Sequence, residues 1–179
     1  MSKLGLTRGT VKLVPNDPRW LLEFNKERGN LENVFGEKIL AIEHIGSTAI
    51  LEIPAKPIID INVGIESIDS ISDFIEPLKK LGYEFMPERR FDDRQFFPKG
   101  PEELRTHHLN LVEIDSETAW LNPLLFRDYL NKNKTVRNEY RALKESLAMK
   151  FANDRMKYSE GKSEFIMKVL EVAKSDVTV

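Results

Sequence analysis

The 179-residue sequence contains no cysteine, and this absence excludes several kinds of chemistry. Without thiols the chain can form no disulfide, no thiolate metal site and no cysteine nucleophile. It therefore does not belong to the small secreted folds that disulfides hold together. Any metal site must use oxygen or imidazole ligands.

Long apolar runs and an excess of positive charge are also missing. No stretch approaches the roughly 20 apolar residues that span a bilayer, and residues 1–10 lack an apolar segment of signal-peptide length. Because 27 basic residues face 29 acidic ones, the formal net charge is -2 and no global positive field can hold a polyanion. These features predict a cytoplasmic protein without membrane association or nonspecific nucleic-acid binding.

Apolar residues are plentiful enough to build a core. The chain is 41% hydrophobic and 31% charged, and one domain of this length can bury much of its surface. No internal repeat, low-complexity tract or Gly/Ser-rich linker divides it. We therefore predict a single domain over residues 1–179.

Hydrophobic periodicity predicts an α/β, or α+β, fold. Asp17-Pro18 is typical of a helix start, and Ser70 with Asp73 resembles a capping box for a second helix that Gly82 ends and Pro77 kinks or shortens. Three further helices are expected after residue 116. The predicted strands are residues 39–45, 58–65, 83–86, 94–97 and 107–114. This order favours a mixed sheet flanked by helices, with a C-terminal helical section packed on it.

The most unusual segment joins the first two predicted strands. Gly46 lets the backbone approach a ligand closely, and Ser47 and Thr48 offer hydroxyl and amide donors to a phosphate. Asp60 lies on the next strand, with Asn62 on the same face because side chains alternate. A carboxylate beside a phosphate seat suits Mg²⁺.

A plainer interpretation of the same residues stays open. The Gly-Ser pair could simply make a tight turn. Asp60, however, is a charged residue between Ile59 and Ile61, and a charge in an apolar strand is costly unless it is paired or coordinating. We therefore favour a functional role for Asp60.

Five blocks of sequence are spread along the chain: Val11–Pro18, Glu43–Ala49, Ala55–Ile61, Arg105–Leu109 and Gly161–Ile166. Their residues, order and spacing resemble the GrpB family. A Gly-Ser pair ending one strand, followed by Asp on the next, also resembles the signature of the polymerase-beta-like nucleotidyltransferase superfamily. The resemblance implies a mixed nucleotidyltransferase-like sheet and a metal-assisted transfer that uses a nucleoside triphosphate and Mg²⁺.

The resemblance also suggests which residues act. Asp60 would serve catalysis and, with Asn62, bind the metal. Glu113 is the candidate for a further carboxylate on the last strand, and we favour His108 over the neighbouring His107 as the catalytic or substrate-contacting histidine. The expected phosphate contacts are Gly46, Ser47, Thr48, Lys56, Arg94 and Arg105, where the arginines could clamp phosphate oxygens bidentately.

Two positions depart from the expected acids and ligands. Asn62 stands where the nucleotidyltransferase signature has an acid, and Asn110 replaces a further potential ligand. Neutral amides add no negative charge to a metal site, so two-metal catalysis is in question. The alternative is a catalytically silent module on the same fold that binds a nucleotide or other phosphorylated small molecule. Because GrpB-like domains occur fused to dephospho-CoA kinase, such a module would serve nucleotide or coenzyme A metabolism. A third possibility, a purely structural partner protein, would need no polar cleft.

Two further features are given structural interpretations. Gly161-Lys162-Ser163 imitates the end of a Walker A loop, but Met156 stands where that motif requires glycine. We expect this segment to join the last helices, and we expect Phe126 to be a core residue.

Overall fold

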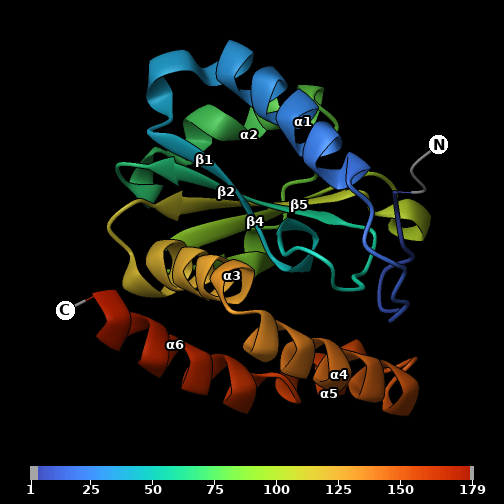
Figure 1. The fold of residues 1–179 in the computed structure, drawn as a ribbon. Coiled ribbons are helices and arrows are strands. Elements are labelled where there is room, and N and C mark those ends of the chain that lie inside the picture. The colour runs from blue at the N-terminus through green and yellow to red at the C-terminus, as the bar shows by residue number, and fades with distance from the viewer. Residues whose placement is uncertain (1–3, 178–179) are drawn as a thin grey trace.

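A five-stranded mixed sheet lies at the centre of the computed structural model, which describes residues 4–177 (Figure 1). The strand order is β1-β2-β5-β4-β3, in which β2 and β5 are parallel and the other neighbours are antiparallel. The mixed sheet confirms the predicted fold class. The strands are β1 (Ala41–Ile45), β2 (Ile59–Ile65), β3 (Arg90–Phe91), β4 (Arg94–Lys99) and β5 (His107–Glu113).

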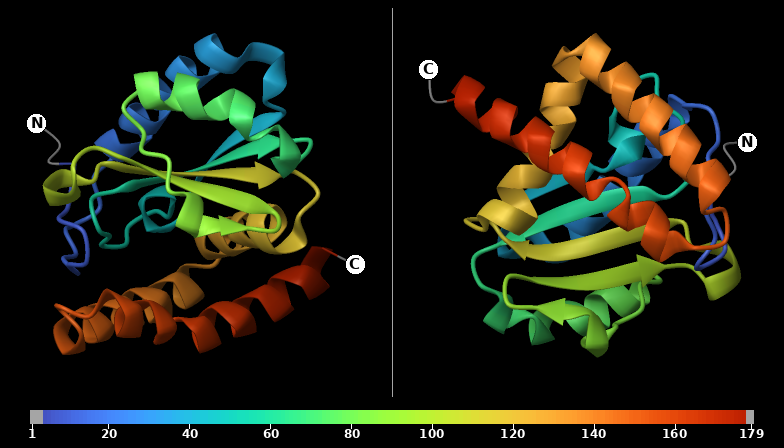
Figure 2. Two further views of the ribbon diagram at one scale, coloured as in Figure 1. Left: turned by 180° about the vertical axis from the view of Figure 1, so that it is seen from behind. Right: turned by 90° about the horizontal axis from the view of Figure 1, so that it is seen from below.

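Helices cover both faces of the sheet (Figures 1 and 2). One face carries α1 (Arg19–Phe35) and α2 (Ser72–Lys80). The other carries α3 (Asn122–Lys132), α4 (Lys134–Lys150), α5 (Arg155–Glu160) and α6 (Ser163–Val177). Between residues 4 and 177, no helix combines the length and apolar character needed to cross a membrane.

Successive side chains of β2 point alternately to the two helical layers that cover the sheet. Ile59, Ile61 and Val63 are buried in the core that also contains residues of α1 and α2. A fully buried side chain of this size stabilises the fold by roughly 2 kcal/mol. Asp60 and Asn62 therefore point to the opposite face, beneath the C-terminal helices.

The predicted strand over residues 83–86 was wrong. Tyr83 forms one isolated bridge with Lys99, and the amide of Glu84 donates to the carbonyl of Pro98 at 2.9 Å. This segment meets β4 only at one end, because the short strand β3 occupies the other end of the same edge. The two-residue β3 was not predicted.

The helix predictions were correct in position and wrong in two details. Ser70 does not cap α2, since its hydroxyl donates to the carbonyl of Ser67 and α2 begins two residues later. Between residues 122 and 177 there are four α-helices, not three, because Asp154 accepts from the amide of Lys157 and starts the short α5. Pro77 lies inside α2, which ends at Lys80.

His44 on β1 is buried beneath α1. Its ring stacks on Phe24 with 4.7 Å between centroids, and Nε2 lies 2.9 Å from Thr48 Oγ1. Thr48 Oγ1 donates to the carbonyl of Ile58, so it accepts the hydrogen of His44 Nε2. Burial lowers the pKa of His44 to about 4. The folded protein therefore holds this imidazole neutral.

His44 should make stability fall in acid. Between pH 6.5 and 4 the unfolded chain binds a proton at this residue that the folded chain does not, so native stability is lost as pH falls, by up to about 3 kcal/mol. His44→Gln keeps a donor for Thr48 without titrating. Urea unfolding of both proteins from pH 8 to pH 4 should show the stability difference shrinking as pH falls, and a constant difference would contradict the neutral, buried imidazole.

Candidate functional site

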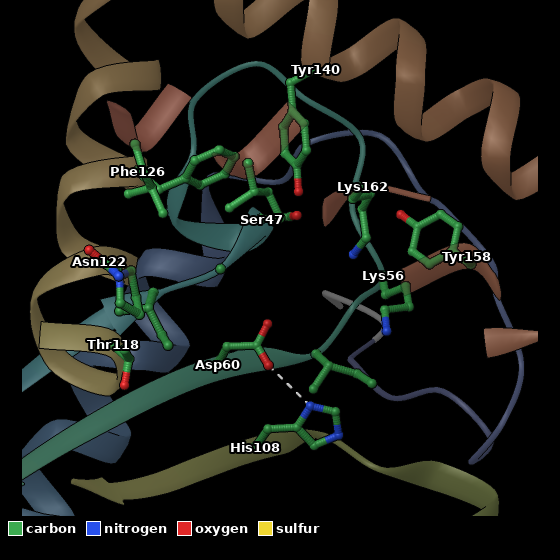
Figure 3. A pocket seen from close by; sticks show the side chains of 16 residues that line it. Ser47, Lys56, Asp60, His108, Thr118, Asn122, Phe126, Tyr140, Tyr158 and Lys162 are labelled. Atoms are coloured by element: carbon green, nitrogen blue, oxygen red, sulfur yellow. Dashed lines mark hydrogen bonds and ion pairs between the residues drawn. The ribbon is translucent and has the colours of Figure 1, made fainter. Parts of the chain in front are cut away.

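A cavity of about 390 Å³ lies between the sheet and the C-terminal helices (Figure 3). Its floor is formed by strand side chains, and its opposite wall by side chains of α3, α4, α5 and α6. Its polar part is lined by the turn at Gly46 and Ser47 and by the side chains of Lys56, Asp60, His108 and Lys162. Five of these six were predicted as site residues.

Gly46 and Asp60 lie on the same cavity wall, as the sequence predicts. The antiparallel register pairs Ile45 with Asp60, so the turn that follows β1 passes directly over this carboxylate. Gly46 adopts a φ of 67°, and a Cβ atom at this position would lie 2.5 Å from Asp60 Oδ2. Only glycine permits this approach.

Asp60 is the one carboxylate among the described residues that line the cavity. Its side chain is 34% exposed, and Oδ1 accepts a hydrogen bond from His108 Nδ1 at 3.0 Å. Burial alone would raise the pKa of Asp60, but the His108 hydrogen bond and the charge of Lys56 outweigh it and lower the pKa. The carboxylate is therefore ionised at neutral pH.

Two lysines face Asp60 across the cavity (Figure 3). The ammonium groups of Lys56 and Lys162 lie 5.9 and 4.6 Å from the ring centroid of Tyr158. Among residues 4–177, neither ammonium group makes a hydrogen bond or close ion pair. Burial lowers the pKa of Lys56 to about 8 and also lowers that of Lys162. Two half-buried cations thus share one carboxylate, which leaves an unmatched positive charge.

The remaining wall of the cavity is mostly apolar and aromatic. Tyr140 places its hydroxyl beside Ser47, and burial raises the pKa of Tyr140 to about 12 (Figure 3). Phe126 packs edge-on against Tyr140, with ring centroids 5.1 Å apart. The other apolar lining residues are Ile45, Ile58, Pro123, Ile166 and Leu170. A ligand with an anionic end and an apolar or aromatic body would fit the lysine-lined end and the aromatic wall of this cavity.

Strand β1 and the loop between β1 and β2 are fixed to the C-terminal helices by four side chains. Asn131 accepts from the amide of Leu51 at 2.9 Å and donates to the carbonyl of Ala49 at 3.1 Å. Buried Lys144 donates to the carbonyl of Pro54 at 2.6 Å. Arg127 and Arg137 bind Glu43 and Glu52, at 2.6 and 2.9 Å. The helices therefore hold the Gly-Ser turn in place as well as lining the cavity.

Asn62 points to the expected face but does not reach the cavity. It is fully buried, its Nδ2 donates to the carbonyl of Ala119 at 2.7 Å, and its Oδ1 accepts from Asn110 at 3.1 Å. Both polar groups of the amide are therefore occupied. The second metal position predicted at Asn62 needs correction, because the turn before α3 covers this residue.

Three other predicted contacts lie elsewhere. Glu113 is on the opposite face of the sheet, where it accepts from the amide of Ile68 at 2.9 Å. Thr48 is buried, and its hydroxyl is occupied by hydrogen bonds to His44 and to the carbonyl of Ile58. The guanidinium group of Arg94 stacks on the ring of Phe91, 4.4 Å from the ring centroid. Glu113, Thr48 and Arg94 are thus corrected from site to structural positions, since strand alternation or local packing turns each one away from the cavity.

The structure separates the two neighbouring histidines and places Arg105 beside the site. His108 faces the cavity, and His107 faces the α1 layer, as alternation predicts. Arg105 binds Glu84 at 2.5 Å and the carbonyl of Gly100. It borders two small hollows that adjoin the cavity.

Sequence reasoning missed the contribution of the C-terminal helices. Lys162, interpreted as part of a connection, projects into the cavity, and Phe126, interpreted as core, lines it. Tyr140 and Tyr158 also line it. The only available signal was that Lys162 belongs to the last of the five family-like blocks.

Comparison with known proteins identifies the family. The model of the family described as GrpB protein matches residues 10–172. The chain belongs to the GrpB family. It is 41% identical to the glutamate-rich protein GrpB of Alkalihalophilus pseudofirmus over 171 residues, which cover 93% of this chain and 98% of that protein.

Solved structures agree with this family membership. GrpB from Enterococcus faecalis superposes with a TM-score of 0.85 at 33% identity, covering 94% of this chain and 100% of that one. The Cid1 poly(U) polymerase in an Mg 3'-dATP-bound crystal structure gives a TM-score of 0.56 at 15% identity, covering 83% and 49%. The second likeness shows a nucleotidyltransferase-like fold.

Part of a longer protein also matches. A dephospho-CoA kinase of Mycolicibacterium paratuberculosis is 26% identical over 177 residues, which cover 86% of this chain but only 44% of that protein. The family's domain thus occurs within a larger chain there.

The acid set of this chain does not fit the metal centre that the fold family implies. Within the described part of the chain, no group of three or more His, Asp or Glu side chains could hold a metal ion. Asp60 stands alone, one of its oxygens is bound to His108, and the neighbouring position is the occupied amide of Asn62. Mg²⁺ prefers one or two carboxylates in octahedral oxygen coordination, which a single carboxylate facing two lysines supplies poorly.

Gly46→Ala should destabilise the protein more than Gly36→Ala. Both glycines have positive φ, but a Cβ atom at Gly36 meets nothing within 4 Å, whereas at Gly46 it collides with Asp60. We expect each variant to lose roughly 1 kcal/mol from backbone strain and Gly46→Ala to lose about 1–3 kcal/mol more. Denaturant unfolding measures both, and equal losses would contradict the close approach of turn and carboxylate.

Proposed function

We propose that this cavity binds a nucleotide or another phosphorylated small molecule and holds its phosphate on protein cations, without a divalent metal. The observation that carries the proposal is the pair of half-buried lysines, Lys56 and Lys162, neither of which forms a close ion pair with a carboxylate of residues 4–177. Removing an ammonium group from water costs several kcal/mol unless an anion compensates it. A phosphate between the two lysines and the Gly46–Ser47 turn would supply that charge.

The shape of the cavity supports a ligand with an organic body. Phe126, Tyr140 and Ile166 offer aromatic and apolar surface next to the polar end, and 390 Å³ is within the range of small-molecule sites. The dephospho-CoA kinase match makes adenine nucleotides and coenzyme A precursors the first probes. On this proposal the domain has an accessory, binding role in nucleotide or coenzyme A metabolism.

Metal-dependent nucleotidyl transfer is the second candidate function. The likeness to Cid1, whose crystal structure has Mg and 3'-dATP bound, favours it at the level of the fold. In-line nucleotidyl transfer uses carboxylates that hold one or two Mg²⁺ ions on the reacting phosphate. The solitary Asp60 and the buried Asn62 weigh against this candidate, so binding without metal is the better-supported function.

Asp60→Asn distinguishes the two candidates by the sign of its effect. Asparagine keeps an oxygen acceptor for His108 but removes the negative charge. If phosphate sits directly on the lysines, ATP with EDTA should bind the variant as tightly as the wild type or up to about tenfold more tightly, because repulsion is gone. If a metal bridges Asp60 and phosphate, binding should instead require Mg²⁺ and be lost in the variant. Calorimetric titration with ATP, with and without Mg²⁺, measures this directly.

Lysine variants provide the matched control for that titration. Lys162→Met should weaken ATP binding about tenfold or more, the usual cost of one charge-assisted contact. Lys168→Met removes an exposed lysine of α6 that pairs with Glu164, and it should change nothing. Equal affinities of the two variants would contradict the proposed phosphate seat.

A further inference from the structure

A second group of cations lies beside His108, outside the main cavity. Two small hollows of about 20 and 10 Å³ are both bordered by His108, which also lines the main cavity. Lys56 borders the smaller hollow and the main cavity. The two hollows therefore lie next to the proposed phosphate site at Lys56 and Lys162. The arginines that line one or both hollows are Arg8, Arg89, Arg105 and Arg155.

These arginines come from four separate parts of the chain. Arg8 lies before α1, Arg89 in the turn before β3, Arg105 before β5, and Arg155 at the start of α5. The cluster is therefore formed by the tertiary fold and is not a local run of basic residues in the sequence. We call these four residues the arginine cluster.

Acidic partners compensate only half of the arginine cluster. Arg105 binds Glu84, and Arg8 binds Glu102. Arg89 stacks on the ring of Phe96 at 4.9 Å and makes no ion pair with a described residue.

Arg155 is the least compensated member of the cluster. Its side chain makes no hydrogen bond or close ion pair with any of residues 4–177. Burial lowers its pKa, and the more distant charge of Asp60 opposes this effect. A half-buried guanidinium without an anion is costly to desolvate. Since guanidinium groups bind phosphate oxygens bidentately, an anionic group of the ligand would remove this cost.

The size of the hollows limits what that group can be. Each hollow, at 10 to 20 Å³, accepts about one water-sized atom, so each can hold one phosphate oxygen but no organic ring. The larger cavity must therefore hold the body of the ligand. A chain of linked phosphates that passes His108 would place one phosphate on Lys56 and Lys162 and the next beside Arg89 and Arg155.

We infer that the arginine cluster is a second anion subsite, and that the ligand carries two or more linked phosphates. This inference rests on the proposed function, since it extends the phosphate seat at Lys56 and Lys162. It narrows the ligand class from any phosphorylated small molecule to diphosphates and longer chains. Arg155 would be a binding residue of this second subsite and not of the first.

Three inorganic probes test the inference by calorimetric titration in EDTA. Orthophosphate, pyrophosphate and tripolyphosphate should bind the wild-type protein with increasing affinity. Arg155→Met should bind orthophosphate within about twofold of wild type but lose tenfold or more of the gain that tripolyphosphate has over orthophosphate. Lys162→Met should weaken all three probes. Arg28→Met, which removes an exposed arginine of α1 that pairs with Glu32, is the control and should match the wild type.

The outcomes separate this inference from the proposed function. If the wild type binds none of the probes, the proposed function fails and the second subsite fails with it. If orthophosphate binds but Arg155→Met keeps the full gain for tripolyphosphate, the subsite alone is overturned. Arg155→Lys retains charge without the planar fork, so it should show an intermediate loss even if the methionine variant folds poorly.

Discussion

The site depends on one electrostatic arrangement, a single carboxylate surrounded by cations. Asp60 is bound to His108 and faces Lys56 and Lys162, and these charges keep it ionised in a half-buried place. The same arrangement leaves the lysines under-compensated, because one negative charge cannot balance two positive ones. An anionic ligand relieves this imbalance, whereas a divalent cation would add to it. The electrostatics of the cavity therefore support the proposal that it takes an anion in preference to a divalent cation.

Two packing constraints place the carboxylate where those charges can act. The register of β1 against β2 brings the turn at Gly46 over Asp60, and the lack of a Cβ atom allows the approach. The loop that follows is tied to α3 and α4 by Asn131 and Lys144. The C-terminal helices thus supply Lys162 and the aromatic wall and also fix the loop that carries Ser47. Loss of helix packing would disturb both halves of the cavity together.

Local rules predicted the sheet side of this site well. Period-two alternation put Asp60 on the face opposite Ile59 and Ile61, and it separated His108 from His107. The glycine at position 46 indicated that the backbone approaches another group closely, and that group is the carboxylate of Asp60. Alternation gives relative faces along one strand only, however, so it could not show that Glu113 on β5 contacts Ile68, before α2, while Asp60 on β2 faces the C-terminal helices.

The helical side could not be predicted from local rules. Tertiary packing of α5 and α6 against the sheet brings Arg155 and Lys162 close to the site. The hydrophobic periodicity of a helix does not predict which part of a sheet that helix will cover. The expectation that Asn62 ligates a metal failed for a similar reason. Its amide is occupied by Ala119 from a turn that is 57 residues distant in the chain.

Direct measurement of divalent-metal binding tests the central claim most simply. Mn²⁺, a paramagnetic substitute for Mg²⁺, can be titrated into the ligand-free protein and followed by the loss of its free electron-spin resonance signal. The account predicts no stoichiometric site with a dissociation constant below about 1 mM, and the same result for Asp60→Asn. One tight Mn²⁺ per protein molecule, lost in Asp60→Asn, would contradict it and restore metal-dependent chemistry as the function of the cavity.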